Sequence, residues 1–452
     1  MDERPYLRIS SYLCALNMNA RDKQILQIAV PSIVSNVTVP LLGMIDVAIV
    51  GHMGDAAYIG AVAVGSMIFN LVYWLFAFLR MGTSGMTAQA LGRRDLGEVT
   101  RILVRSAAVA GGIAAGLIIL QVPLMWLMFW LIGPTADVAP FAEAYFRIVI
   151  WGAPASLGLF GLMGWYIGMQ NTRIPMFVSI MQNIVNIIAS LTLVYGLGMK
   201  IEGVATGTVV AQYAGLLVAV VLLVKYYGKI FKRHGSLTIR RHRQSAGGYH
   251  VNRDIFLRTL CLVAVNLYFT SAGARQGAVI LSVNTVLLQL YLFFSYFMDG
   301  FAYAGEALCG RYYGAQNGTA FRKTLRRLFG WMLLVTAAYT FIYIGGGMQI
   351  VGLLTDEPQV LEAAHSYIGW AWFIPVAGCV AFIWDGVFIG ITATRGMLLS
   401  SFLAAAIFFG VYGLTMGFMG NHGLWLAQIV YLAVRGVVQT VWYRLKITPA
   451  IP

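Results

Sequence analysis

The sequence has few charged residues and few cysteines. Asp, Glu, Lys and Arg make up 11% of its 452 residues, whereas 59% are hydrophobic and the mean hydropathy is +0.76. A soluble protein carries roughly a quarter charged residues, so this composition excludes an ordinary soluble domain. The four cysteines are far apart and form no CxxC, and the six His are scattered. Neither a disulfide framework nor a metal site is indicated.

Motifs typical of enzymes are also missing. The chain contains no GxxxxGK[ST], HExxH or GxSxG, and no His lies near the acids of its apolar stretches. ATP-driven pumping requires a nucleotide-binding motif, and an enzyme acting on lipids would require paired acids such as DDxxD. We therefore predict that the protein is not an enzyme and has no cofactor, no catalytic residues and no metal.

Long apolar stretches recur from one end of the chain to the other. A helix needs about 20 apolar residues to cross a bilayer. Twelve stretches approach or exceed this length: 25–50, 57–81, 100–122, 140–168, 174–196, 203–226, 254–276, 278–304, 324–347, 362–391, 397–418 and 422–444. We predict an all-α polytopic membrane protein with 12 transmembrane helices in the lipid bilayer. The shorter apolar piece at 123–132 is predicted to extend along the membrane surface.

A polar and basic stretch at 225–253, KYYGKIFKRHGSLTIRRHRQSAGGYHVNR, divides the chain into two halves. We interpret it as a solvated linker rather than a surface for anionic lipid or nucleic acid, and expect no nucleic-acid partner. The predicted organisation is a cytoplasmic N-terminal segment at 1–24, an N-lobe of six helices at 25–227, a cytoplasmic linker at 228–252, a C-lobe of six helices at 253–446 and a tail at 447–452.

The distribution of positive charge predicts the orientation. With the N-terminus inside, 27 of the 31 Lys and Arg fall in inner segments. Membrane proteins concentrate Lys and Arg in cytoplasmic loops, which also explains the net charge of +14. Residues 1–24 contain no signal-peptide pattern. We expect a multi-pass protein of the inner (cytoplasmic) membrane with both termini in the cytoplasm.

The two halves contain similar segments. RMGTSGMTAQALGRR (80–94) aligns without gaps to FMDGFAYAGEALCGR (297–311), which pairs Gln89 with Glu306. WGAP (151–154) parallels WFIP (372–375), and GMQNTR (168–173) parallels GITATR (390–395). With six spans in each half, the halves are predicted to be pseudo-symmetric about an axis along the membrane normal, an architecture of transporters.

Asp46 is the principal candidate in the first half, within LLGMIDVAIVGH (41–52). A carboxylate at the bilayer centre costs roughly 3 kcal/mol on insertion scales, which favours a functional role. Pro40 removes a backbone hydrogen bond six residues earlier and is the predicted hinge. Asn183, Asn186 and Ser190 recur on one face of the fifth span. They either solvate the carboxylate or a coupling ion, or join helices to one another.

The second half has several ionisable residues within or near its spans. Asp299 and Glu306 are seven residues apart and therefore share a helix face, Asp385 stands alone in FIWDGVFIG, and Arg275 lies near a span end. Acids around a dry cavity can exchange protons. Alternatively they are structural, with Arg435 of the last span as a neutralising partner; the structural role is favoured for Glu306.

Several of these motifs resemble multidrug and toxic compound extrusion (MATE) transporters. MIDVAIVGHMG (44–54), AQALGRR (88–94), GMQNTR and IEGVATGT (201–208) are similar to the first lobe of that family. MDGFAYAGEALCGRYYGA (298–315) and WDGVFIGITATR (384–395) resemble its DinF branch. The resemblance covers about residues 20–445. It implies a MATE-like fold of two six-helix lobes, alternating access, and export of small organic, often cationic compounds against proton or sodium entry.

The resemblance also implies roles for individual residues. The acid of the family's first helix corresponds to Asp46, its fifth-helix amides to Asn183 and Asn186, and its tenth-helix acid to Asp385. Members commonly carry a second first-lobe acid where this sequence has Ser190. A single carboxylate holds one proton but makes a weak sodium site.

We therefore expect a secondary active exporter of cationic or amphipathic compounds, in which inward proton flow protonates Asp46 and bends the first helix. Sodium coupling and a lipid-precursor flippase of a related two-lobed fold are the alternatives. We expect the protein to be a monomer, with H+, or alternatively Na+, as its coupling ion.

Overall fold

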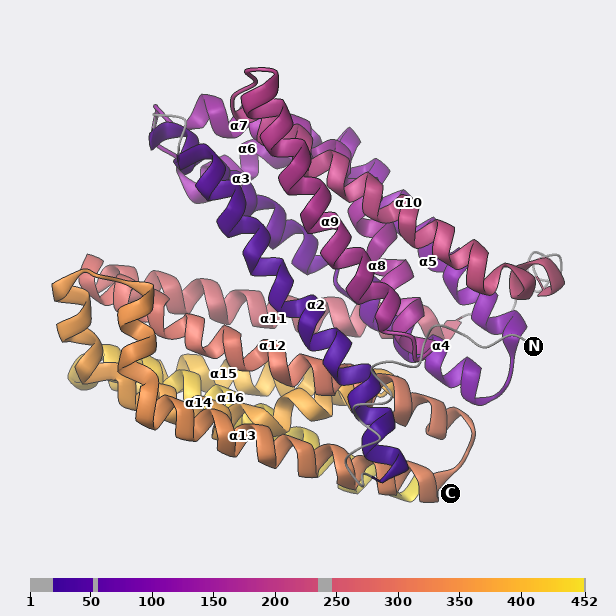
Figure 1. Cartoon of the computed structure of the whole chain (residues 1–452). Helices are drawn as coiled ribbons and strands as arrows, with labels where there is room; N and C mark the ends of the chain where they lie inside the picture. Colours follow the sequence, from indigo (N-terminus) through magenta and orange to yellow (C-terminus); the bar gives the residue numbers. More distant parts are fainter. Residues whose placement is uncertain (1–18, 52–55, 235–245, 451–452) are drawn as a thin grey trace.

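The computed structural model describes residues 19–51, 56–234 and 246–450, which fold into helices (Figure 1). Within them, eleven helices are long and apolar enough to cross a membrane. In addition, α2 (Ala20–Gly51) covers the predicted first span. The predicted all-α architecture of a polytopic membrane protein is confirmed.

The first lobe contains α2 to α10. The helices after α2 are α3 (Ala56–Leu75), α4 (Phe78–Gly92), α5 (Leu96–Ile119), α6 (Gln121–Ile132), α7 (Ala139–Val149), α8 (Ala153–Gly168), α9 (Arg173–Leu191) and α10 (Ile201–His234). A 3-10 turn at Ile150–Gly152 joins α7 to α8, and a π turn at Thr192–Gly196 follows α9. Helices α3 and α4 form one span that continues to Gly92, so the predicted end of the second span at residue 81 is wrong.

The second lobe contains α11 to α16. They are α11 (Ala246–Arg275), α12 (Ala278–Gly314), α13 (Gly318–Leu354), α14 (Pro358–Gly390), α15 (Thr394–Met419) and α16 (Asn421–Trp442). Helices α10 and α11 take up both ends of the predicted linker, whose residues 235–245 lie outside the described residues. Residues 1–18 of the predicted N-terminal segment and 451–452 of the predicted tail do so as well.

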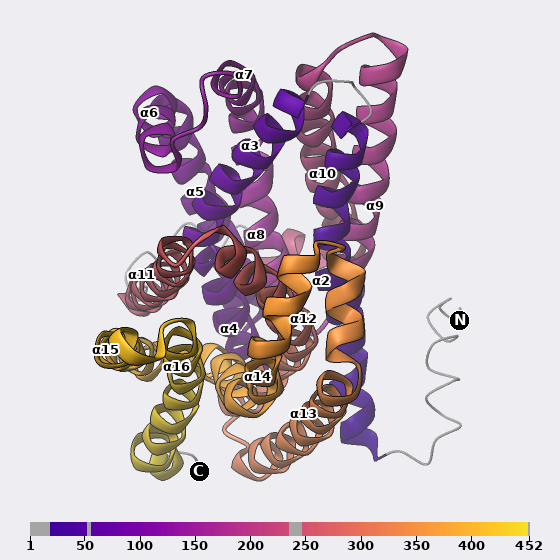
Figure 2. The same cartoon turned by 90° about the vertical axis from the view of Figure 1, so that its left-hand side faces the viewer.

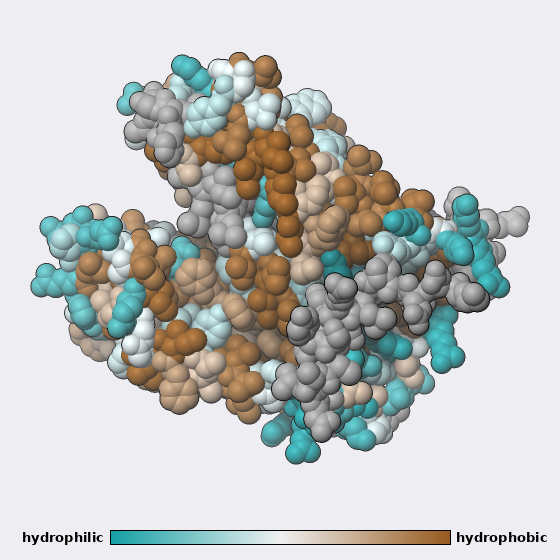
Figure 3. All heavy atoms as spheres, viewed as in Figure 1, coloured by the Kyte–Doolittle hydropathy of each residue, from teal (hydrophilic) through white to brown (hydrophobic). Residues whose placement is uncertain are grey.

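The two lobes meet at one end of the molecule and diverge toward the other (Figure 1). The end where they meet contains the turns at 93–95, 169–172, 315–317 and 391–393, and hydrophilic residues gather there (Figure 3). We call it the basic end because arginines lie in or beside these turns: Arg93, Arg94, Arg173, Arg311 and Arg395. Figure 2, turned by 90°, shows α6 and α7 at the opposite end of the first lobe. At that end Figure 3 shows a hollow between the lobes.

Helix α2 contacts both lobes. Near its start, the Arg21 guanidinium donates a hydrogen bond to the Ala320 carbonyl oxygen at 2.9 Å, and the Asp22 carboxylate lies 3.3 Å from the Arg327 guanidinium. Farther along, the Ser35 hydroxyl of α2 and the Ser179 hydroxyl of α9, in the first lobe, form a 2.8 Å hydrogen bond with each other. Helix α2 therefore starts on the second lobe and ends in the first.

Close helix contacts give the register of the internal repeat. A Cβ added to Gly164 would lie 2.2 Å from the Arg80 carbonyl oxygen, and one added to Gly386 would lie 2.1 Å from that of Ala302. These equivalent contacts are offset by 222 residues, as are Gln170 and Thr392, which both have positive φ.

The predicted gapless pairing of Gln89 with Glu306 is therefore wrong by five residues. The position equivalent to Gln89 is Arg311, and the position equivalent to Glu306 is Ser84, because Gly168 approaches the Ser84 carbonyl as Gly390 approaches that of Glu306. Small residues recur through both segments, so identities alone do not set the register; the close glycine contacts do.

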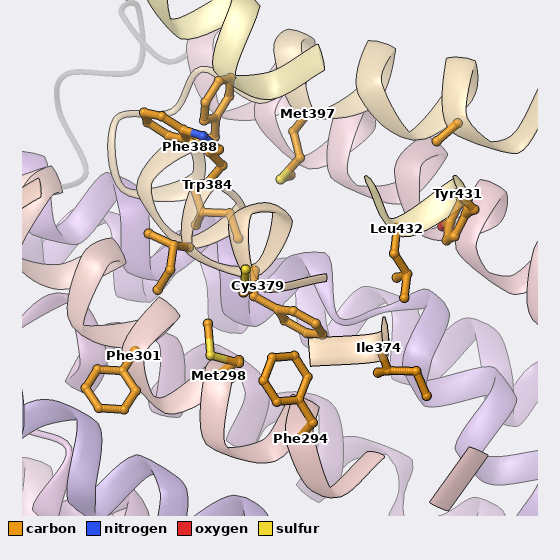
Figure 4. Packing of buried hydrophobic residues seen from close by; sticks show 14 of the residues in the cluster. Phe294, Met298, Phe301, Ile374, Cys379, Trp384, Phe388, Met397, Tyr431 and Leu432 are labelled. Atoms are coloured by element: carbon orange, nitrogen blue, oxygen red, sulfur yellow. The ribbon is translucent and has the colours of Figure 1, made fainter. Parts of the chain in front are cut away.

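The core of the second lobe lies between α12 and α14. Phe294 and Met298 of α12 lie beside Cys379 of α14, and all three are buried (Figure 4). Helix α14 continues through Pro375, whereas the first lobe breaks between α7 and α8 just before Pro154. This packing fixes α12 and α14 relative to each other, and other residues of both helices line a cavity described below.

Candidate functional site

Asp46 is buried near the end of α2. Its side chain is 5% exposed, and its Oδ1 has no hydrogen-bond partner among the described residues. Tyr145 of α7 lies close enough to interact with it electrostatically. An ionised carboxylate in such a place is costly unless it is paired. Binding of a proton or a cation at Asp46 removes that cost.

The predicted amides of the fifth span lie on α9, and each one donates a hydrogen bond to a different neighbouring helix. The Asn183 side chain donates a hydrogen bond to the Thr38 carbonyl oxygen of α2 at 2.8 Å. The Asn186 side chain donates to the Thr208 hydroxyl of α10 at 3.2 Å. Asn186 and Ser190 are fully buried, and the Asn186 Oδ1 and Ser190 Oγ have no hydrogen-bond partner within the described part of the chain.

Tyr145 and Thr208 connect Asp46 to Asn186, and sequence reasoning did not select either one. Tyr145 interacts with both Asp46 and Thr208, and Thr208 in turn accepts the hydrogen bond from Asn186. Thr208 ends the IEGVATGT segment, which was a usable signal, whereas nothing near Tyr145 in the sequence marks it. For the predicted hinge, the backbone of α2 is helical through residue 40; the Pro40 side chain lies outside the described residues.

A cavity of about 370 Å³ lies in the second lobe and is closed on one side by α4 of the first. Three of the predicted candidates line it, namely Asp299, Glu306 and Asp385. Three arginines line it as well: Arg80, Arg258 and Arg435. Arg275 is not among the lining residues; it is exposed at the end of α11.

Asp385 accepts hydrogen bonds from two buried arginines. Arg258 of α11 and Arg435 of α16 both donate to its Oδ2, the latter at 2.5 Å, and the Gln439 side chain donates to its Oδ1 at 2.6 Å. Arg258 is 5% exposed and Arg435 is 4% exposed. Two guanidinium groups thus share one carboxylate, which joins α11, α14 and α16.

Glu306 pairs with an arginine from the other lobe. Its Oε2 lies 3.7 Å from the Arg80 guanidinium, which also stacks over the Tyr303 ring at 4.4 Å. Arg80 is one of the 27 Lys and Arg that the predicted orientation assigns to inner segments, but it lies within α4 and reaches the cavity.

Asp299 differs from the other two acids of the cavity. It lies on α12 seven residues before Glu306 and is partly exposed to the cavity. Across the described ranges it forms no hydrogen bond and no ion pair, although Arg80, Arg258 and Arg435 are near enough to act on it electrostatically. It is therefore the acid most available to a ligand.

Sequence reasoning missed Arg258 as a site residue. It is one of the 27 Lys and Arg assigned to inner segments, yet it interrupts the apolar run IFLRTLCLVAV (255–265). A charge in such a run was the same signal that selected Asp46. Its position near the predicted end of the span concealed it.

Three comparisons with known proteins, by family model, by sequence and by structure, give consistent results. Residues 31–192 and 255–412 match a family model described as MatE. The chain is 37% identical over 437 residues to DNA damage-inducible protein F of Escherichia coli (strain K12), covering 96% of this chain and 94% of that protein. It is 26% identical to Protein DETOXIFICATION 44, chloroplastic, of Arabidopsis thaliana, covering 91% and 80%.

The fold is similar to that of a solved structure described as the outward-facing conformation of a multidrug resistance MATE family transporter of the MOP superfamily. The TM-score is 0.84 at 19% sequence identity, and the similarity covers 95% of this chain and 97% of the other. This similarity confirms the predicted two-lobed fold.

Proposed function

Because the chain belongs to the multidrug and toxic compound extrusion (MATE) family of membrane transporters, which are not enzymes, we propose that it exports small organic compounds in exchange for protons that bind Asp46. The resemblance to the DinF branch is confirmed by the Escherichia coli relative. We further propose that the protein works as a monomer without a cofactor in the inner membrane, with the basic end and both termini in the cytoplasm.

The observation that carries the proposal is the buried Asp46 on a helix shared by both lobes. Its Oδ1 has no hydrogen-bond partner among the described residues, so protonation changes its energy strongly in this position. Helix α2 is attached to α13 near Arg21 and to α9 near Ser35. A movement of α2 on protonation therefore shifts the lobes relative to each other.

Coupling by this route requires that Asp46 be charged in one facing of the transporter and neutral in the other. A proton then biases the equilibrium between the two states by its different affinity for each. In the neutral state Asp46 packs against the apolar first-lobe core, and in the charged state it faces water or a cationic substrate. Bending of α2 at Pro40 is the proposed motion between them.

Sodium coupling is the second candidate, and one observation favours it. Among the buried oxygens of the first lobe that have no hydrogen-bond partner within the described residues are Asp46 Oδ1, Asn186 Oδ1 and Ser190 Oγ. They are the kind of oxygen that a hard cation binds. Proton coupling remains preferred because Ser190 replaces a second acid. A lipid-precursor flippase would need a strongly cationic cavity, and the second-lobe cavity balances three arginines with three acids.

The test uses the purified protein in lipid vesicles loaded with a cationic fluorescent dye. We expect an imposed proton gradient to drive dye transport, and Asp46→Asn to reduce it to the level of empty vesicles. Asp137→Asn, an exposed acid of the same lobe, is the control and should transport normally. Full gradient-driven transport by Asp46→Asn would exclude the coupling role. Transport driven by a sodium gradient alone would select sodium, and movement of labelled lipid precursors without dye transport would select the flippase.

A further inference from the structure

The second-lobe cavity has more hydrogen-bond donors than its own residues use. A guanidinium group carries five N–H donors. Arg258 and Arg435 each donate one hydrogen bond to Asp385, and the Nε atoms of both are buried without a partner among the described residues. Buried donors without acceptors are costly, so the pair is suited to a ligand that brings acceptor oxygens, such as a carboxylate.

An acid faces the same cavity. Asp299 lines it without a hydrogen bond or ion pair in the described part of the protein, whereas Asp385 is held by two arginines and Glu306 lies beside Arg80. Asp299 is therefore suited to a ligand that brings an ammonium group. The cavity has a positive pole at Arg258 and Arg435, and a negative group at Asp299.

The charge of the cavity selects between classes of ligand. Its three arginines and three acids balance when all are ionised. A ligand with a net charge leaves that charge uncompensated in a site of low dielectric constant, which is costly. A zwitterion introduces no net charge and gives each pole a partner.

The walls and size of the cavity indicate an aromatic or otherwise apolar body for this ligand. Trp74, Tyr291, Tyr303, Phe382 and Tyr431 line it. Its volume of about 370 Å³ is at the small end of the range for small-molecule sites, roughly 300 to 1,000 Å³.

We propose that the second-lobe cavity binds amphipathic zwitterions, with the carboxylate of the ligand on Arg258 and Arg435 and its ammonium group near Asp299. This inference rests on the proposed export function, whose substrate class it names. It assigns substrate selection to the second lobe and leaves ion coupling to Asp46 in the first.

The test compares three compounds built on one aromatic amino acid scaffold: the zwitterion, its methyl ester with charge +1, and its N-acetyl derivative with charge −1. Binding to the purified protein in lipid nanodiscs is measured by calorimetry at pH 7 without any gradient. We expect the zwitterion to bind at least about tenfold more tightly than either derivative.

Two variants should change the order of affinity. Asp299→Asn leaves the cavity with one extra positive charge, so the N-acetyl anion becomes the preferred ligand. Arg258→Gln leaves one extra negative charge, so the methyl ester becomes preferred. Arg275→Gln, an exposed arginine on the same helix as Arg258, is the matched control and should keep the preference for the zwitterion.

Similar affinities for the three compounds, no binding of any, or an order that Asp299→Asn leaves unchanged would each overturn the proposal. If Arg258→Gln does not fold, Asp299→Asn decides alone, because Asp299 has no hydrogen bond or ion pair to lose among the described residues. Binding without a gradient separates this inference from the proposed function. Gradient-driven dye transport with no zwitterion preference refutes only the inference, and zwitterion preference without transport refutes only the export mechanism.

Discussion

Asp385 is the carboxylate that compensates the charges of two buried arginines, and its removal leaves those charges without an acceptor inside the protein. In Asp385→Asn, Arg258 and Arg435 lose their shared acceptor inside the second lobe. Removing one partner of a buried charge pair typically costs about 3–5 kcal/mol. We expect Asp385→Asn to unfold at a clearly lower temperature than the wild type, measured by thermal unfolding of the purified protein. Asp356→Asn, at an exposed acid, is the control and should unfold with the wild type.

A second substitution tests whether the loss of stability comes from uncompensated charge or from lost packing. If uncompensated charge is the cause, Asp385→Asn combined with Arg435→Gln should recover part of the lost stability, because one guanidinium charge is removed with the carboxylate. A double variant that is less stable than Asp385→Asn alone would show that the arginine stabilises the lobe by its packing instead.

Among single residues, the sequence identified charges inside spans but not their partners. Asp46, Asp299, Glu306 and Asp385 stand out because a charge in an apolar run is costly. Their surroundings come from other helices: Tyr145 is about 100 residues from Asp46, and Arg80 more than 200 from Glu306. Such pairings depend on how the lobes pack, which no local pattern in one sequence encodes.

At the scale of elements, α6 has an unusual exposure. It is a short helix of 12 residues between α5 and the span that α7 and α8 form together, and Trp126 and Trp130, one helical turn apart, are each 70% exposed. Tryptophan is enriched at membrane–water interfaces, and helices that lie in the interface insert only about 5–10 Å. We predict that α6 lies in the interface and does not enter the bilayer centre.

The depth of α6 can be measured with nitroxide labels on single cysteines in a cysteine-free background. A label at Trp126→Cys should give a shallow depth by oxygen and nickel-chelate accessibility. A label at Gly112→Cys on α5, where an added Cβ meets no atom within 4 Å, should lie deeper. Equal depths at the two sites, or full exposure to water at Trp126, would contradict the prediction.

Most helices were predictable from apolar length, because each bilayer span leaves the same signature. The boundaries that failed have identifiable causes. Arg80 resembles the end of a span, yet α4 continues past it because Glu306 and Tyr303 accommodate its charge inside the protein. The repeat was recognisable, but its register depends on glycine contacts such as Gly164 with Arg80, which only the packed structure reveals.

At the scale of the whole molecule, the contacts that join the lobes at the basic end include two equivalent hydrogen bonds. The Gln89 side chain donates to the Thr392 hydroxyl at 3.0 Å, and the Arg311 guanidinium donates to the Gln170 side chain at 2.9 Å. Gln89 and Arg311 occupy equivalent positions of the two lobes, as do Gln170 and Thr392. The pseudo-twofold axis thus relates these two contacts, and the Gln89 side chain additionally donates to the Gly390 carbonyl oxygen at 3.0 Å.

The proposed alternating access requires these lobes to separate at the basic end during each cycle. We therefore predict that a covalent link there stops transport. In a cysteine-free background, Gln89→Cys with Thr392→Cys, joined by a short reducible thiol cross-linker, should lose gradient-driven dye transport in vesicles and regain it on reduction. The equivalent pair Arg311→Cys with Gln170→Cys should behave in the same way, because the axis relates the two contacts.

The control is a link that stays within one lobe. Asn284 of α12 and Asn421 of α16 exchange two hydrogen bonds, at 2.8 and 2.9 Å, inside the second lobe. Asn284→Cys with Asn421→Cys, cross-linked by the same reagent, should keep its transport if each lobe moves as a unit. Undiminished transport with the Gln89 and Thr392 positions linked would mean that substrate passes without separation of the lobes at the basic end. Loss of transport in the control as well would place the motion within the second lobe rather than between the two.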